Sequence, residues 1–290
     1  MVEPGATHVL HQRIRYDYRE PVSDLRHRLV VVPPLRHGGQ RRLRHRVTAT
    51  GARTWLSARR DGFGNHVVDV WSPSVSSALE FEAWTVVAAP AGDGLVDVAP
   101  EAHLDPRFLR PSPLTRPDAR ITDVARSLAG PAGPAGPARG AGLAERICAW
   151  VHAALRYQFG VTGVRTGAAE ALAAGGGVCQ DHAHLMLALC RASGLAARYV
   201  SGHLVGEGGS HAWVEVVVPD AGRPSGAVAL ALDPTHERRA ATGYLTVAVG
   251  RDYGDVAPTS GTFSGPGPGS LRTSKRLELV SSGSLPPVRA

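Results

Sequence analysis

The pattern of apolar residues changes near residue 110, and this change restricts the fold more than any other feature of the sequence. Before it, short runs of β-branched and aromatic residues are separated by turn residues such as Pro33-Pro34 and Asp61-Gly62. Several strands at this spacing predict an antiparallel β-sandwich. After it, apolar residues recur at helical spacing and are followed by strand patterns over residues 197–232. The sequence therefore predicts an α+β fold, with a β-sandwich-like domain followed by a core of helices packed on an antiparallel sheet.

The same patterns give a division of the chain into domains. We expect a β-rich N-terminal domain over residues 1–105, a second domain over residues 106–280, and a flexible tail over residues 281–290. Within the second domain, the stretch from Gly130 to Gly142 is rich in proline and glycine, which predicts a linker without helix. Residues 276–280 are expected to form the last strand of the chain.

Length and composition limit the class of protein. With 290 residues and 43% hydrophobic residues, the chain can bury a core, so global disorder is excluded. It contains no apolar run long enough to span a membrane. The first ten residues lack the apolar stretch of a signal peptide, which leads us to expect a cytoplasmic protein without membrane association. Three cysteines without CxxC spacing argue against a disulfide framework and a zinc knuckle.

The net charge of +7 is concentrated in the first sixty residues, which hold 13 arginines and four acidic residues. Such a field could attract nucleic acid. However, Arg42, Arg44 and Arg46 alternate with other residues in the pattern of a strand with one solvated face, and the aromatic residues of a single-strand binding groove are missing. The sequence therefore argues against nucleic acid as a partner.

Cys179 is the first candidate for a reactive residue. It follows Gly175-Gly176-Gly177 and begins a helix whose apolar face continues to Cys190. The unpaired N–H groups of a helix N-terminus favour a thiolate and can hold a developing oxyanion, and the glycines allow a substrate backbone to approach. The alternative is that Cys179 is a small buried residue, as most free cysteines are. Cys148 and Cys190 lie among apolar neighbours within helices and are interpreted as core residues.

His211 and Asp233 are the candidates for a base and its orienting acid. The segments from His211 to Val218 and from Val228 to Asp233 both alternate, as two strands of a hairpin would. If Val214 pairs with Leu230, His211 lies directly opposite Asp233 on one face. A nucleophile, a base and an orienting carboxylate are the three parts of a catalytic triad. A register shift of one residue would break this arrangement.

The sequence indicates no cofactor and no metal. EF-hand, phosphate-loop and dinucleotide fingerprints are missing. His182 and His184 are two residues apart on a helix and therefore face different directions, which does not suit a pair of metal ligands.

Three segments resemble, in order and spacing, the motifs of the bacterial transglutaminase-like family. They are Gly177-Val-Cys-Gln-Asp-His-Ala-His-Leu185, His211-Ala-Trp-Val-Glu215 and Asp233-Pro-Thr235. Tyr16-Asp-Tyr-Arg-Glu-Pro-Val22 and Asp61-Gly-Phe-Gly-Asn65 are similar to the β-rich domain that precedes the core in many members. The resemblance implies a papain-like cysteine-enzyme fold, with Cys179 as nucleophile, His211 as base and Asp233 as the orienting acid.

Three more residues are candidates for the site. Gly177 and Gln180, which flank Cys179 closely, and Trp213, two residues beyond His211, are candidate substrate-binding or oxyanion residues. Trp213 could wall the site, or it could be a packed aromatic of the core.

The resemblance implies acyl transfer on peptide or protein amide bonds through a thioester. The acceptor stays open: an amine would make the protein a transglutaminase, and water would make it a cysteine peptidase or amidase. A different class of function is a binding scaffold that has lost catalysis, although a scaffold has no need of all three triad residues. The expected partner is a peptide or protein substrate.

Overall fold

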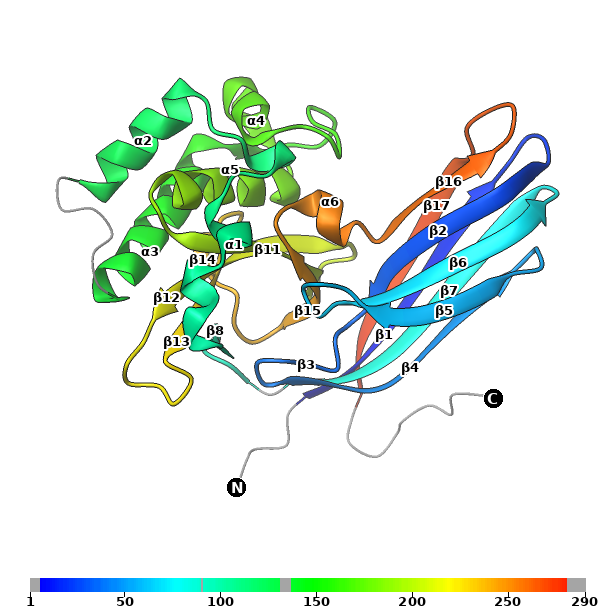
Figure 1. The fold of residues 1–290 in the computed structure, drawn as a ribbon, viewed down its shortest axis with the longest axis horizontal. Helices are drawn as coiled ribbons and strands as arrows, with labels where there is room; N and C mark the ends of the chain where they lie inside the picture. The colour runs from blue at the N-terminus through cyan, green and yellow to red at the C-terminus, as the bar shows by residue number, and fades with distance from the viewer. Residues whose placement is uncertain (1–5, 90, 131–136, 281–290) are drawn as a thin grey trace.

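The computed structural model describes residues 6–89, 91–130 and 137–280. The chain forms two lobes, a β-sandwich and a helix-rich core, which lie side by side (Figure 1). Most strands of the core form one antiparallel sheet, and the longer helices pack together on one face of it. The predicted α+β fold class, with the cysteine-bearing helix packed on an antiparallel sheet, is confirmed.

Two antiparallel sheets form the sandwich. Their strands are β1 (Ala6–Asp17), β2 (Val22–Val32), β3 (Arg36–His37), β4 (Gln40–Thr50), β5 (Trp55–Arg60), β6 (His66–Val75), β7 (Ala78–Ala89), β16 (Thr259–Ser264) and β17 (Ser270–Val280). One sheet has the order β17-β1-β7-β4-β3 and the other β16-β2-β6-β5. Alternate side chains such as Ile14, Leu29 and Phe81 meet between the sheets, because successive residues of a strand point to opposite faces.

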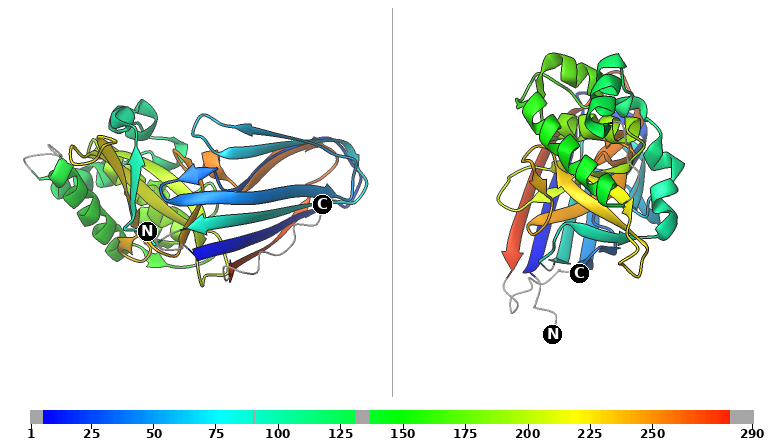
Figure 2. Two further views of the ribbon diagram at one scale, coloured as in Figure 1. Left: turned by 90° about the horizontal axis from the view of Figure 1, so that it is seen from below. Right: turned by 90° about the vertical axis from the view of Figure 1, so that its left-hand side faces the viewer.

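The last two strands correct the predicted domain boundaries. β16 pairs with β2 and β17 pairs with β1, so residues 259–280 complete the sandwich, although the prediction assigned them to the core. The right-hand view of Figure 2 shows the red β17 beside the blue β1. The core is thus inserted between β7 and β16 of the sandwich. The tail predicted for residues 281–290 lies outside the described residues.

The core is built around one buried helix, α5 (Cys179–Ala192). Every residue from Gln180 to Arg191 is buried, which is expected of a helix covered on all sides. The other helices are η1 (Pro100–Leu104), α1 (Pro106–Leu109), η2 (Pro113–Thr115), α2 (Ala119–Ala129), α3 (Pro137–Ala154), α4 (Ala168–Ala174) and α6 (Tyr253–Val256). α2, α3 and α4 pack against α5, which itself lies on the sheet.

The sheet of the core has the order β14-β13-β12-β11-β15, with β8 also paired to β13. Its strands are β8 (Leu95–Val98), β11 (Ala196–Leu204), β12 (His211–Pro219), β13 (Ala227–Asp233), β14 (Arg238–Arg239) and β15 (Tyr244–Gly250). A separate parallel pair, β9 (Arg156–Tyr157) and β10 (Gly176–Gly177), lies just before α5 in the chain.

The prediction of a helix-free linker from Gly130 to Gly142 is wrong for its second half. α3 begins at Pro137, and a proline is tolerated at the first helical position because its missing N–H would have no partner there. Residues 131–136 lie outside the described residues. Gly130 ends α2 with a φ of 66°, a conformation that glycine adopts without strain.

The hairpin of β12 and β13 is present, but its predicted register is shifted by two residues. Val214 pairs with Leu232, and not with Leu230. A shift of two keeps each side chain on the predicted face, because the side chains of a strand alternate with a period of two. His211 and Asp233 therefore still share a face, although they lie diagonally and not directly opposite each other.

The sandwich covers the edge of the core sheet at β15. The side-chain amide of Gln40 donates to the carbonyl of Thr246 at 2.7 Å and accepts from its N–H at 2.9 Å. Asn65 bonds to both backbone groups of Val249 in the same way, at 2.7 and 2.8 Å. Two amide side chains thus satisfy polar groups that an edge strand would otherwise leave open.

A buried ion cluster joins the same two lobes. The Glu215 carboxylate on β12 is 1% exposed and accepts from His37 of the sandwich at 2.6 Å and from Arg198 of β11 at 2.6 Å. Burial alone would raise the pKa of Glu215, but the charges of Arg198 and His37 outweigh it and lower that pKa to about 2.

Among the described residues, we find no helix of the length and apolar character needed to cross a bilayer.

Candidate active site

Cys179 is the first residue of α5. The preceding residue, Val178, has an extended backbone, and its N–H donates to the Asp181 carboxylate at 2.8 Å. This carboxylate also accepts from the Thr162 hydroxyl at 2.7 Å. The bonds fix the start of the helix, so the thiol lies beside the first N–H groups, which have no acceptor within the helix. Cys179 is partly exposed, whereas Cys148 and Cys190 are buried.

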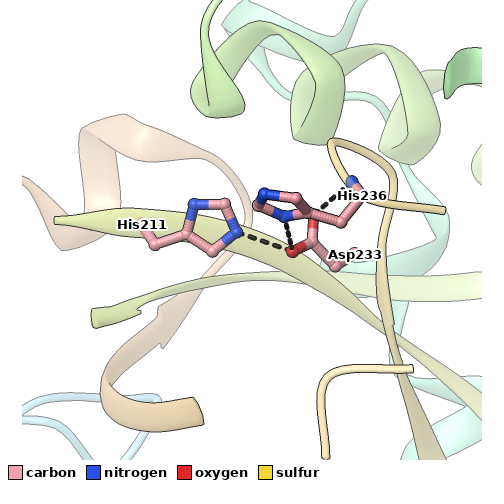
Figure 3. A group of neighbouring side chains, drawn as sticks. All are labelled: His211, Asp233 and His236. Carbon is pink, nitrogen blue, oxygen red and sulfur yellow. Dashed lines mark hydrogen bonds and ion pairs between the residues drawn. The ribbon is translucent and has the colours of Figure 1, made fainter. Parts of the chain in front are cut away.

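His211 and Asp233 meet at one end of the sheet, because His211 begins β12 and Asp233 ends β13. Nε2 of His211 lies 2.7 Å from Oδ2 of Asp233, and both side chains are buried (Figure 3). The predicted contact between the two residues on neighbouring antiparallel strands is therefore confirmed. Because Nε2 faces the carboxylate, the other ring nitrogen, Nδ1, is the one that can exchange a proton with the thiol.

The Asp233 carboxylate has more donors than a triad requires. Its Oδ2 also accepts from the Tyr244 hydroxyl at 2.6 Å and from Nδ1 of His236 at 2.8 Å, while Oδ1 accepts from the N–H of Thr235 at 2.8 Å. Figure 3 shows the two imidazoles approaching this carboxylate. Burial would raise the pKa of Asp233, but the bonds from His211, Tyr244 and His236 outweigh it, so the pKa lies far below its usual range and the group stays ionised.

The charge on His211 follows from its two neighbours. Burial would lower the pKa of its imidazole, yet the hydrogen bonds with Asp233 and Cys179 reverse this effect and raise that pKa to about 10. An imidazolium between a carboxylate and a thiolate is the activated state of a cysteine nucleophile. The arrangement therefore places a proton donor, held by a carboxylate, close to a partly exposed thiol.

The other three predicted site residues, Gly177, Gln180 and Trp213, are all buried. Gly177 is buried, and a Cβ added to it would lie 2.5 Å from Oδ2 of Asp181, so glycine is needed to leave room for that carboxylate. Gln180 is buried, with its side-chain amide 3.4 Å from the carbonyl of Gly163. Trp213 is 1% exposed and packs edge-on against Tyr244. Direct contact of these side chains with a substrate is not supported by their burial.

Three residues near the triad were not predicted from the sequence. His236 was within reach of prediction, because Pro234 follows Asp233 and forces a turn that brings a residue three positions later back to the carboxylate. Tyr244 begins β15, which is not the neighbour of β13, and no local pattern links them. Glu207 lies in the loop before β12, with Oε2 3.6 Å from Nδ1 of His211.

The donor atoms of His211, Asp233 and His236 all lie within 4.8 Å of one another, and such a set could hold a metal ion. The sequence did not predict this set, since His236 was not recognised. In the structure the two imidazoles are hydrogen-bonded to one carboxylate oxygen, an arrangement that orients His211 without any ion.

We expect iodoacetamide to label Cys179 at least about a hundredfold faster than either other cysteine at neutral pH, because only a thiolate reacts readily. Burial, with the nearby charge of Asp233, raises the pKa of Cys148 to about 12, and burial also raises that of Cys190. Peptide mapping of the folded protein over time measures the three rates. Equal rates at Cys179 and Cys148 would contradict the assignment of Cys179 as the activated thiol.

Comparisons with known proteins agree with this geometry. Residues 126–222 match the transglutaminase-like superfamily, and residues 9–88 match the bacterial transglutaminase-like N-terminal region. Uncharacterized proteins of Mycobacterium tuberculosis and Mycobacterium bovis are each 31% identical to this chain over 252 residues, which is 77% of this chain and 76% of theirs.

A solved structure has the same fold. It belongs to a protein of Cytophaga hutchinsonii described as a candidate cysteine protease, and it superposes with a TM-score of 0.75 over 97% of this chain and 93% of that one. The two sequences are 20% identical, so the likeness concerns the fold. With its sandwich, its buried cysteine-bearing helix and both matched regions, this chain belongs to the bacterial transglutaminase-like family and has the general fold of the cysteine enzymes.

Proposed function

We propose that the protein transfers acyl groups from peptide or protein amides through a thioester on Cys179. One observation carries the proposal: the His211 imidazole is held at 2.7 Å by the ionised Asp233, and it lies near enough to the partly exposed thiol of Cys179 for that group to raise its pKa. Each of the three groups has the partner that its part in a triad requires.

The proposed chemistry begins with attack of the Cys179 thiolate on the amide carbonyl carbon. The carbonyl oxygen becomes an oxyanion beside the unpaired N–H groups at the start of α5. Protonated His211 then gives its proton to the amide nitrogen, the C–N bond breaks, and an amine leaves. The thioester remains on Cys179, and His211 is neutral and ready to accept a proton from the acceptor.

The second half of the reaction reverses these steps with a new nucleophile. His211 takes a proton from an amine or from water as it attacks the thioester carbon, and the Cys179 thiolate leaves. The products are a new amide or a carboxylate, and the thiolate–imidazolium pair is restored. The substrate in this proposal is a peptide or protein, since the reactive carbonyl belongs to an amide.

Intact-protein mass spectrometry after rapid mixing with a peptide library tests the proposal. We expect wild-type protein to gain the mass of an acyl fragment and Cys179→Ala to gain none, because alanine cannot form a thioester. A primary amine added to the library identifies the second step: amine incorporated into peptides indicates amine transfer, and cleaved peptides indicate hydrolysis. Identical behaviour of wild type and Cys179→Ala would overturn the proposal in favour of a non-catalytic scaffold.

We also propose that the protein works in the cytoplasm, in a reducing environment. The proposed nucleophile must stay a free thiol, and the structure holds Cys148, Cys179 and Cys190 unpaired. Fractionation of cells that express the tagged full-length protein checks the location, and recovery in an exported fraction would contradict it.

A further inference from the structure

Glu207 places a carboxylate at the open side of the site. It lies in the loop of residues 205–210, which connects β11 to β12 and contains Gly206, Gly208 and Gly209. A Cβ added to any of these three glycines would meet no atom within 4 Å. The Glu207 side chain is itself 42% exposed. The Glu207 carboxylate is therefore open to solvent.

The two oxygens of Glu207 face the two imidazoles of the site. Oε2 lies 3.6 Å from Nδ1 of His211, and Oε1 lies 3.2 Å from Nε2 of His236. The first distance is longer than a hydrogen bond, so Glu207 is near the catalytic nitrogen without being bonded to it. Nδ1 of His211 is the atom that takes the proton of the acceptor in the proposed reaction.

The Asp233 carboxylate cannot bind an incoming cation, although it lies close to the reacting groups. Its carboxylate is fully buried and already accepts from His211, His236, Tyr244 and Thr235. Arg238, whose positive charge is also felt at this site, donates to the Tyr244 hydroxyl at 2.9 Å. Glu207 is thus a carboxylate that is both accessible and within reach of the reacting groups.

Exposed aromatic rings lie near the thiol, because Tyr157 pairs with Gly177, two residues before Cys179. Tyr157, at the end of β9, is 50% exposed, and its ring lies edge-on to that of Phe159 with centroids 5.3 Å apart. Burial and then the charges of Cys179 and Glu207 raise the pKa of the Tyr157 hydroxyl, as expected for a ring close to both residues. A ligand with a charged nitrogen and an alkyl stem matches a carboxylate beside exposed aromatic rings.

We infer that Glu207 is a specificity residue that binds the acyl acceptor, and that this acceptor is a protonated primary amine with an alkyl stem. The inference rests on the proposed thioester chemistry and adds to it the class of acceptor. Water carries no positive charge that a carboxylate would attract, whereas an alkylammonium ion forms a charge-assisted hydrogen bond with it.

The proton balance assigns a separate task to each group. Glu207 attracts the ammonium ion, which must lose one proton to solvent before its nitrogen has a free electron pair. The neutral amine attacks the thioester carbon and forms the C–N bond, His211 takes the second proton at Nδ1, and the C–S bond breaks to restore the Cys179 thiolate. Glu207 raises the local concentration of amine but transfers no proton to the reacting atoms.

Partition of one acyl-enzyme between two acceptors tests the inference. The full-length protein is acylated with p-nitrophenyl acetate, and nitrophenol release reports formation of acetyl-Cys179. The acetyl group then partitions among water, n-butylamine, which is a cation at neutral pH, and methoxyamine, which is uncharged there. Mass spectrometry of the products gives the ratio of butylamide to methoxyamide, with Cys179→Ala supplying the uncatalysed background.

We expect Glu207→Gln to lower this ratio about tenfold, the value of one charge-assisted contact at a half-exposed site. Glu207→Asp keeps the charge and should recover most of the ratio. Glu237→Gln is the matched control, because Glu237 is a half-exposed carboxylate 4.0 Å from His152 and its loss changes the net charge equally. It should leave the ratio as in wild type.

The opposite results are distinguishable. If Glu207→Gln slows acylation and both aminolysis reactions by one common factor, the ratio is unchanged and Glu207 only supports the charge of His211, which overturns the inference. A ratio that falls equally in Glu237→Gln would show a general effect of net charge and would also overturn it. If Cys179 forms no acetyl-enzyme at all, the proposed function itself fails, and the inference fails with it.

Discussion

Replacement of Asp233 by asparagine is expected to slow acylation of Cys179 by about a thousandfold or more, the scale of effect seen when a triad loses its carboxylate charge. Asparagine has nearly the same shape, but it cannot stabilise an imidazolium. Its amide could also turn its NH₂ group toward His211, which would hold the imidazole in the wrong tautomer. The burst of nitrophenol from p-nitrophenyl acetate measures the acylation rate directly.

Tyr244→Phe provides the matched control for Asp233→Asn. It removes the 2.6 Å hydrogen bond to Oδ2 but leaves the carboxylate charged and still bonded to His211. We expect a loss of about fivefold to tenfold, as for one hydrogen bond to a charged group. Circular dichroism of both variants shows whether the fold is kept. A well-folded Asp233→Asn protein that acylates within tenfold of the wild-type rate would exclude Asp233 as the orienting acid.

Replacement of Glu215 by glutamine is expected to lower the free energy of unfolding by about 3 kcal/mol, because it leaves the buried charge of Arg198 without its counter-ion. Urea denaturation at neutral pH measures the change. Asp69→Asn is the control: Asp69 pairs with Arg59 at 2.6 Å, as closely as Glu215 pairs with His37, but on the exposed surface. Its loss should cost less than about 1 kcal/mol.

The pH dependence of stability gives an independent check on Glu215. Its pKa is depressed in the folded state, from an ordinary value of 4.5 to about 2, so the carboxylate stabilises the fold above about pH 4.5. This stabilisation is lost as the pH falls from 4.5 toward 2. Wild-type stability should therefore fall more steeply than that of Glu215→Gln in this window. Parallel curves for the two proteins would show that the Glu215 charge does not stabilise the fold.

The triad could be predicted from sequence because two different periodicities point to it. Helical spacing places Cys179 at the start of a buried stripe, and alternation places His211 and Asp233 on one face of a hairpin. The prediction tolerated an error of two residues in the register, since only an odd shift would have moved Asp233 to the other face. The roles of the three residues in a reaction remain a proposal.

Other features depend on contacts that no local pattern encodes. Tyr244 reaches Asp233 from a strand on the far side of the sheet, and Glu207 reaches His211 from a glycine-rich loop whose path has no periodicity. The assignment of β17 to the sandwich depends on pairing between residues more than 250 positions apart. Sequence patterns give the type of an element well, but they do not give its partner across such distances.

The insertion of the core between β7 and β16 affects how the protein is made. On a ribosome, β1 and β2 emerge first, yet their neighbours β17 and β16 are the last strands to appear. Until then the early strands β1 and β2 each lack one neighbour, and open edges invite pairing with other chains. The sandwich can close only after the whole core has been synthesised. A stalled or shortened chain should therefore present two unpaired sheet edges and be an early target for chaperones and proteases.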